Sequence, residues 1–209
     1  MKKILVAIPT YSGQIPIEIV FNLLQMKVPE GYQVNFSYCK RTLIDIARNG
    51  IAQGMLNNGH DYLFFVDDDT IPPTDALKVM LELDKPIVVA PVPARREGGE
   101  NRLCIFSDDQ GTQLSELKEE RKVSAGGMSC TLIRRDALEA VANKFGKPFA
   151  FERIGEIPWT EDTNFCRRAG LLGFETWATP KVCPQHIGQP VIYVYEPQNE
   201  KSETYILPC

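Results

Sequence analysis

The sequence has few histidines, no closely spaced cysteines and no long apolar run, and each absence narrows what the chain can be. Two of its 209 residues are histidines, and its six cysteines include no CxxC pair. A zinc ribbon or a CxxC redox site is therefore not indicated. No apolar run approaches the roughly 20 residues needed to cross a bilayer. We expect a cytoplasmic protein without a membrane span, whose thiols are reduced and partly buried.

The sequence also lacks a basic excess. The formal net charge is −4 and the isoelectric point about 5.3, so we expect no binding to nucleic acid or to an anionic membrane surface. Hydrophobic residues make up 44% of the chain and charged residues 24%, as in globular domains. The apolar stretch at 4–8 is too short for a signal peptide and predicts a buried first strand.

Three adjacent carboxylates are the most informative feature that is present. Asp67, Asp68 and Asp69 directly follow the apolar run 62–66, which predicts a buried strand. A strand that ends in this way carries negative charge to the edge of a sheet, where open α/β folds bind ligands. Carboxylates this close repel one another unless a divalent cation compensates. The sequence therefore predicts a metal–phosphate site, with a solvated acidic turn as the alternative.

Strand and helix patterns alternate through the first half. The βαβ order predicts a mostly parallel central sheet flanked by helices. The expected strands are 3–8, 32–38, 62–66 and 85–91, and the expected helices are 17–26, 42–56 and 74–83. The second half is less regular, with a charged segment at 114–122, strand-like runs at 123–133, 175–178 and 182–194, and helices at 135–145 and 163–171. We predict one domain over 1–209, with a nucleotide-binding half at about 1–94 and an acceptor-side half at about 95–209.

A second acidic pair and a late histidine complete the set of chemical groups. Glu161 and Asp162 precede the predicted helix 163–171, where a carboxylate can cap the helix or act as a general base. His186 follows a predicted strand, and a lone histidine is structural more often than it is a ligand.

The order of these motifs resembles that of the GT-A-fold glycosyltransferases, in particular the family 2-like members. Asp67-Asp68-Asp69 matches the DxD motif and Thr160-Glu161-Asp162 matches the xED motif, and a late histidine such as His186 often completes the metal site. The segments 47–49, 64–69 and 126–138 are also typical of this family. The resemblance covers roughly residues 3–190.

The resemblance implies a hexosyltransferase-type, metal-dependent activity. A nucleoside diphosphate sugar would donate its sugar to the hydroxyl of a saccharide or other acceptor, with inversion. Asp162 would be the general base, and Glu161 would orient the acceptor or hold the helix start. The metal, Mn²⁺ or Mg²⁺, would take ligands from Asp69 and His186, and Asp67 would reach the nucleoside or the metal through water. The residues implied in donor binding are Pro9, Thr10, Tyr11, Arg48, Asp67, Asp68, Gly126 and Gly127. We also expect 95–101 and the segment after His186 to order when donor binds.

Three other functions fit parts of the pattern. Asp67 and Asp69 could be the nucleophile and the acid/base of a haloacid-dehalogenase-type phosphatase, although that motif normally follows the first strand. A nucleotidyltransferase would carry a glycine-rich phosphate loop after its first strand, and 9–14 is a poor version of one. A nucleotide-sugar-binding protein with degraded catalysis is the non-enzymatic alternative.

Overall fold

The computed structural model describes residues 1–94, 102–187, 191–194 and 204–206. The loop 95–101 and most of the segment after His186, which we expect to order on donor binding, lie outside these residues. Within the described ranges no helix is both long enough and apolar enough to cross a bilayer.

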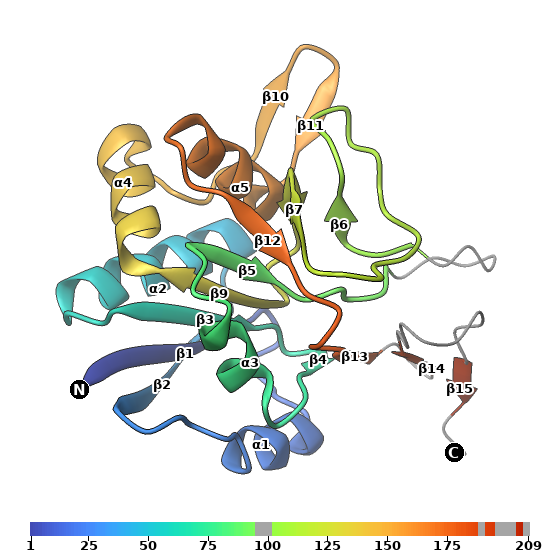
Figure 1. Ribbon diagram of the computed structural model, residues 1–209. Helices are drawn as coiled ribbons and strands as arrows, with labels where there is room; N and C mark the ends of the chain where they lie inside the picture. Colours follow the sequence, from blue (N-terminus) through green and yellow to red (C-terminus); the bar gives the residue numbers. More distant parts are fainter. Residues whose placement is uncertain (95–101, 188–190, 195–203, 207–209) are drawn as a thin grey trace.

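A seven-stranded sheet forms the centre of the molecule (Figure 1), in the order β2-β1-β3-β9-β5-β12-β7. Its strands are β1 (Lys2–Thr10), β2 (Tyr32–Lys40), β3 (Tyr62–Val66), β5 (Ile87–Val89), β7 (Arg121–Val123), β9 (Cys130–Arg134) and β12 (Thr176–Ala178). β1 pairs in parallel with both β2 and β3, and β12 pairs in parallel with β5. The predicted mostly parallel central sheet is therefore confirmed.

β9 departs from the simple βαβ expectation. It runs antiparallel between β3 and β5. β3 and β5, which the βαβ pattern predicts to be neighbours, are therefore separated by a strand from the second half of the chain. Four of its five residues, Cys130 to Ile133, are buried. An apolar run of this kind needs a neighbour on each side to pair its backbone groups, and the space between β3 and β5 provides both.

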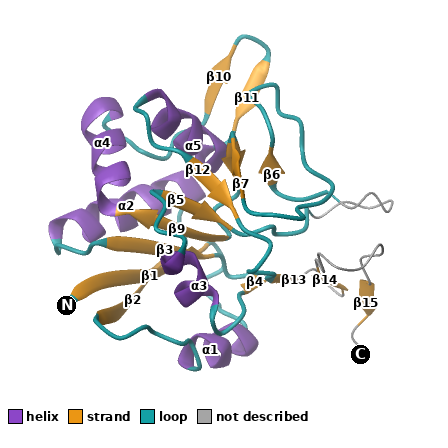
Figure 2. Cartoon of the chain, in the orientation of Figure 1, coloured by secondary structure: helices purple, strands orange, loops and turns teal. Residues whose placement is uncertain are grey.

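Helices cover both faces of this sheet (Figure 2). They are α1 (Ile17–Leu24), α2 (Ile44–Asn57), α3 (Ala76–Glu82), α4 (Arg135–Phe145) and α5 (Glu161–Leu171). Side chains of α2, α4 and α5 pack in one buried cluster, and those of α1 and α3 pack in another on the opposite face. Burial of both faces explains why β3 is apolar at every position.

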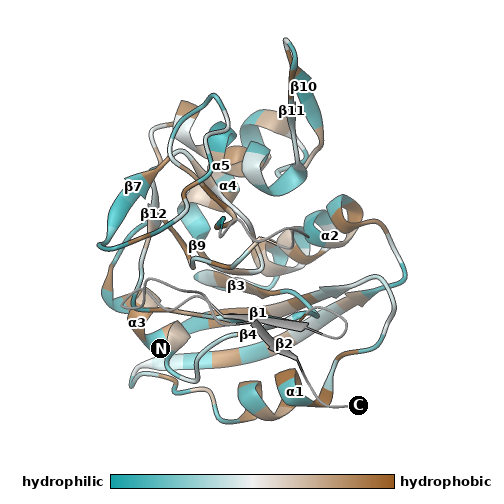
Figure 3. Ribbon diagram, turned by 90° about the vertical axis from the view of Figure 1, so that its right-hand side faces the viewer, coloured by the Kyte–Doolittle hydropathy of each residue, from teal (hydrophilic) through white to brown (hydrophobic). Residues whose placement is uncertain are grey.

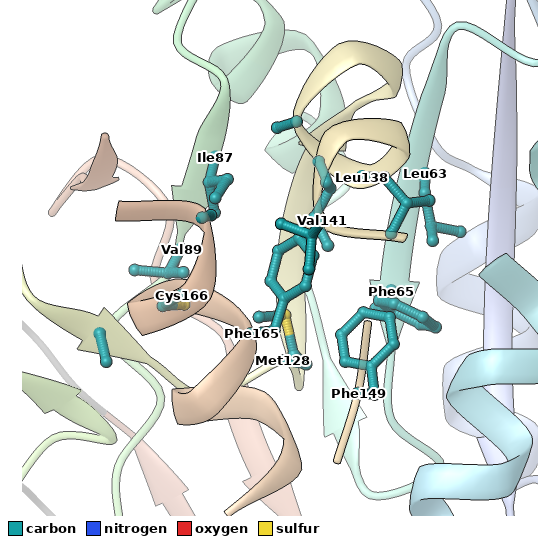
Figure 4. Packing of buried hydrophobic residues seen from close by; sticks show 14 of the residues in the cluster. Leu63, Phe65, Ile87, Val89, Met128, Leu138, Val141, Phe149, Phe165 and Cys166 are labelled. Carbon is teal, nitrogen blue, oxygen red and sulfur yellow. The ribbon is translucent and has the colours of Figure 1, made fainter. Parts of the chain in front are cut away.

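Three phenylalanines connect the sheet to α5 (Figure 4). The rings of Phe149 and Phe165 stack with centroids 4.8 Å apart, and Phe65 meets Phe149 edge-on at 5.6 Å. Phe65 belongs to β3 and Phe165 lies one turn after Glu161. The apolar core therefore sets the start of α5 beside the end of β3.

Small sheets complete the described structure. β4 (Thr70–Ile71) pairs with β13 (Gln185–Ile187), which continues to β14 (Val191–Val194) and β15 (Thr204–Ile206). β6 (Ile105–Phe106) pairs with β8 (Ala125–Gly126), and β10 (Glu152–Ile154) forms a hairpin with β11 (Ile157–Trp159).

Several predicted boundaries are wrong. α5 begins at Glu161 and not at residue 163, so the acidic pair forms its first turn. β1 continues through Thr10, beyond the predicted end at residue 8. The charged segment 114–122 is irregular up to β7, which begins at Arg121. The run 123–133 is divided among the end of β7, β8 and β9, and the β10–β11 hairpin was not predicted.

Candidate active site

The candidate site lies at the point where the strand order changes direction. β2 lies on one side of β1 and β3 on the other. The two crossovers therefore leave the sheet to opposite sides, and their carboxyl ends border a crevice. Thr10 ends β1 and Asp67 follows β3, so the acidic run lies at this crevice, as the sequence predicts.

Arg48 is the centre of a buried ionic cluster at the crevice. Arg48 belongs to α2, and the residue is 2% exposed. Nη2 donates to both carboxylate oxygens of Asp67, at 2.9 and 3.0 Å, and Nη1 donates to Glu161 at 2.9 Å. Nη1 also lies 4.0 Å from Oδ2 of Asp162. We call Arg48, Asp67, Glu161 and Asp162 the Arg48 cluster; it joins the two acidic motifs.

The charges of this cluster do not balance when all its groups are ionised. One guanidinium faces three carboxylates. Burial alone would lower the pKa of Arg48, but Asp67, Asp162 and Glu161 raise it. Burial and the charge of Asp162 raise the pKa of Glu161 to about 7, against the attraction of Arg48. The excess negative charge is thus partly relieved by retaining a proton on Glu161.

Asp162 is held through one of its two oxygens. Oδ1 accepts from the Thr160 hydroxyl at 2.5 Å and from the Thr163 backbone N–H at 2.7 Å. Thr160 occupies the N-cap position of α5 but its side chain caps no backbone group. Oδ2 faces Gly127, where an added Cβ would lie 3.7 Å from it. Glycine at this position therefore keeps the space beside Oδ2 open.

Gly126 and Gly127 have different surroundings. A Cβ at Gly126 would come within 2.7 Å of the Val89 side chain, so glycine is required where β8 packs against β5. A Cβ at Gly127 would lie 3.2 Å from Cys104 and would face Asp162. Of the two predicted donor-binding glycines, Gly127 is the one that borders the Arg48 cluster.

A second pair of groups, which we call the rim pair, consists of Asp69 and His186. The pairing of β4 with β13 places Thr70 opposite His186, and Nε2 of His186 lies 3.5 Å from Oδ1 of Asp69. Nδ1 of His186 lies 2.7 Å from the carbonyl oxygen of Pro93. A carbonyl can only accept, so Nδ1 carries the hydrogen. In the neutral ring, Nε2 then presents its lone pair toward Asp69.

This geometry fits a site with two protein ligands. Histidines that bind metals usually donate their other ring N–H to a carbonyl or carboxylate, which fixes the tautomer. Within the described residues no group of three or more His, Cys, Asp or Glu side chains is arranged to hold a metal. Asp67, the third predicted ligand, is turned toward Arg48 instead.

The end of β1 contributes a ligand-sized pocket. Its volume is about 570 Å³, and it is lined by Ser12, Gln14, Ile15, Pro16, Asp68, Asp69 and Ile187. The hydroxyl of Thr10 accepts from the Gly13 N–H at 3.1 Å and so holds the loop that follows β1. Tyr11, in the same loop, is 76% exposed. Partial burial, together with Asp69 and Asp67, raises the pKa of Asp68, although Thr10 opposes this shift. Pro9 is buried in β1.

Some participants were not identified from the sequence. Thr160 and the Pro93 carbonyl orient Asp162 and His186, and Ser12 and Gln14 line the pocket. Thr160 appears in the sequence analysis only as part of the match to the xED motif, and its contact with Asp162 is a local one. The Pro93 contact joins positions 93 residues apart, and no local pattern indicates it.

Comparison with known proteins supports the fold. No protein-family model matches the sequence, and no curated protein matches it either. A crystal structure of A197 from STIV has a TM-score of 0.65 at 17% identity, covering 100% of this chain and 95% of that one. A crystal structure of S. aureus TarS has a TM-score of 0.50 at 13% identity, covering 86% of this chain and 35% of TarS. These neighbours have glycosyltransferase-like folds, and this chain shares that fold class.

Proposed function

We propose that the chain transfers a sugar from a nucleoside diphosphate sugar to an acceptor hydroxyl, in a reaction that depends on Mn²⁺ or Mg²⁺. The Arg48 cluster is the observation that carries this proposal. It brings the carboxylate after β3 and the carboxylates that start α5 to one buried arginine. The glycosyltransferase-like fold of the structural neighbours supports the same conclusion.

The donor would bind in the pocket at the end of β1. A volume of about 570 Å³ is within the range of small-molecule sites. The exposed ring of Tyr11 could stack on a base, and Asp68, whose pKa is raised, could hydrogen-bond a sugar hydroxyl. The diphosphate would then lie toward Asp69, which lines the pocket and also belongs to the rim pair.

Asp69 and His186 would hold the metal. A divalent cation at this position would stabilise the negative charge that develops on the departing diphosphate. Both oxygens of Asp67 accept from Arg48. Asp67 would therefore hold Arg48 in place and would not bind the metal directly. An imidazole with a carboxylate favours Mn²⁺ over Mg²⁺.

Asp162 would take the proton from the acceptor hydroxyl. Thr160 and the Thr163 N–H fix its Oδ1, so Oδ2 would be the basic atom on the side of Gly127. Direct attack on the anomeric carbon with this single base would invert that centre. Glu161 would position Arg48 and the start of α5, because its side chain is buried behind the reacting groups.

Calorimetry with a panel of nucleoside diphosphates and nucleotide sugars, in Mn²⁺ and then in EDTA, tests the proposal. We expect metal-dependent binding in the wild type that is lost in Asp69→Ala and retained in Asp162→Asn. Asp136→Ala is a matched control, because Asp136 lies on α4 at the opposite end of the sheet and pairs with Arg134. Donor hydrolysis without acceptor, lost in Asp162→Asn, would distinguish an enzyme from a binding protein. Absence of binding by the folded wild type would refute the proposal.

A further inference from the structure

The edge strand β2 has features that no role in the candidate site explains. β2 is the last strand of the central sheet on its side, and it pairs with β1 over all nine residues without a bulge. Exposed edges are usually protected by proline, bulges or inward-pointing charges. Within β2 the only charged residue is Lys40 and there is no proline. Among the described residues, therefore, one long and regular sheet edge is uncovered.

The backbone groups at this edge belong to the even-numbered residues. The N–H of Lys2 donates to Gly31 and the N–H of Arg41 donates to Thr10. In a parallel pair the residues that bond to the neighbour alternate, so odd-numbered residues of β2 face β1. The even-numbered residues from Tyr32 to Lys40 direct their N–H and C=O groups outward, except that the N–H of Tyr32 donates to the carbonyl of Pro29.

The side chains of the same residues form an apolar face. Alternation along a strand places Tyr32, Val34, Phe36 and Tyr38 on one side of the sheet. Phe36 is 57% exposed and Tyr38 60% exposed. α1 covers this face farther in (Figure 3), through Ile19 and Leu23. α1 also exposes an apolar stripe of its own at Ile17, Phe21 and Leu24.

We propose that β2 pairs antiparallel with β2 of a second copy of this chain, about a two-fold axis at Phe36. This register opposes Phe36 to Phe36, Val34 to Tyr38 and Tyr32 to Lys40. All of these are even-numbered residues, so every outward backbone group of β2 finds a partner in the other copy. The two sheets then become one continuous sheet with an apolar seam on the α1 side.

A second copy fits this edge better than an unrelated strand because the edge is complementary to itself. A two-fold interface requires that residue i meets j while j meets i, and the register above satisfies this along the whole strand. At each end, Glu30 of one copy comes beside Lys40 and Arg41 of the other, so the terminal charges attract. Phe36 and Tyr38, both on the paired strand, would together bury up to about 250 Å² per subunit, a part of the roughly 800 Å² typical of a stable interface.

Sedimentation velocity over a range of concentrations tests the association. We expect a wild-type dimer that Phe36→Lys converts to a monomer, because two like charges would meet on the axis. Leu171→Lys is the matched control: Leu171 is 65% exposed, at the end of α5, and the variant should remain dimeric. Circular dichroism confirms that each variant is folded. A monomeric wild type, or a dimer unaffected by Phe36→Lys, would overturn the proposal.

A single cysteine tests the register itself. The register opposes residue 33 to Cys39 of the partner subunit in a non-hydrogen-bonded pair, where Cα atoms lie about 4.5 Å apart and a disulfide can form. Gln33→Cys should therefore yield a covalent dimer under mild oxidation, and the added substitution Cys39→Ser should abolish it. A covalent dimer that persists with Cys39→Ser, or none at all from a dimeric Gln33→Cys protein, would rule out this register. Neither readout depends on nucleotide or sugar binding.

Discussion

The two ends of the aspartate run, only two residues apart, are built in different ways. Asp67 turns inward and is neutralised within the protein, where both its oxygens bind a guanidinium that is itself fully buried. Asp69 is about one-third exposed and faces His186 across two short strands. The Arg48 cluster is thus a buried part of the core, whereas Asp69 of the rim pair lines the pocket. The inward end of the motif is therefore held by a buried guanidinium, and the outward end lies at the pocket wall.

Removal of Arg48 should have the largest effect on stability. Arg48→Met would leave Asp67, Glu161 and Asp162 without their cation in a buried setting, which costs about 3–5 kcal/mol for comparable buried pairs. We expect a loss of this size in the free energy of unfolding, measured by urea denaturation. Arg134→Met is the control, because Arg134 pairs with Asp136 at the surface, and it should cost no more than about 1 kcal/mol. Equal losses in the two variants would contradict the central role assigned to Arg48.

Asp162→Asn should affect turnover and leave folding nearly unchanged. Asparagine keeps the oxygen that accepts from Thr160 and Thr163 but cannot take a proton from the acceptor. General-base catalysis contributes roughly 10²–10⁴-fold, so we expect the transfer rate to fall by that factor while donor affinity stays within about threefold. Steady-state kinetics with parallel calorimetry measures both. Retention of full transfer activity would assign the base to another residue.

Local patterns predicted the two motifs, and tertiary contacts joined them. The strand Tyr62–Val66 and the helix Arg135–Phe145 are confirmed at both ends, because each has a strong apolar period that stops abruptly. The contact between Arg48 and Glu161 spans 113 residues. It depends on Phe65, Phe149 and Phe165 packing together, which no local window contains. Arg48 was expected to bind the donor, and no local pattern indicates that it binds Asp67 and Glu161 instead.

The insertion of β9 was unpredictable for a similar reason. A buried apolar run such as Cys130–Ile133 specifies that it lies inside a sheet, but not between which strands or in which direction. The rim pair depends in turn on β4, a strand of two residues that is too short to show a periodic pattern. The sequence could therefore indicate His186 as a candidate without indicating that Asp69 faces it.

Glu161 should make the stability of the Arg48 cluster depend on pH. Its pKa is raised to about 7 in the folded protein from an ordinary value of 4.5, so the folded state binds more protons between these values. The proton on Glu161 therefore contributes to the free energy of unfolding. This contribution is fully present below pH 4.5 and is lost as the pH rises through 7. A shift of this size corresponds to about 3 kcal/mol. Urea denaturation measures the free energy of unfolding at pH 5 and at pH 8. The decrease from pH 5 to pH 8 should be smaller for Glu161→Gln than for the wild type. Identical decreases would contradict the raised pKa of Glu161.

Metal binding should produce the smallest effect on stability, and it should involve only the rim pair. A ligand at ten times its dissociation constant stabilises the folded state by about 1.4 kcal/mol, so Mn²⁺ with a nucleoside diphosphate should raise the melting temperature by a few degrees. Asp69→Asn and His186→Ala should lose this increment. His60→Ala is the control, because His60 precedes β3 at the opposite end of that strand, and it should retain the increment even if the variant is less stable overall. An increment that survives in Asp69→Asn and His186→Ala but disappears in Asp67→Asn would reverse the assignment, making the inward aspartate the metal ligand and Arg48 its competitor.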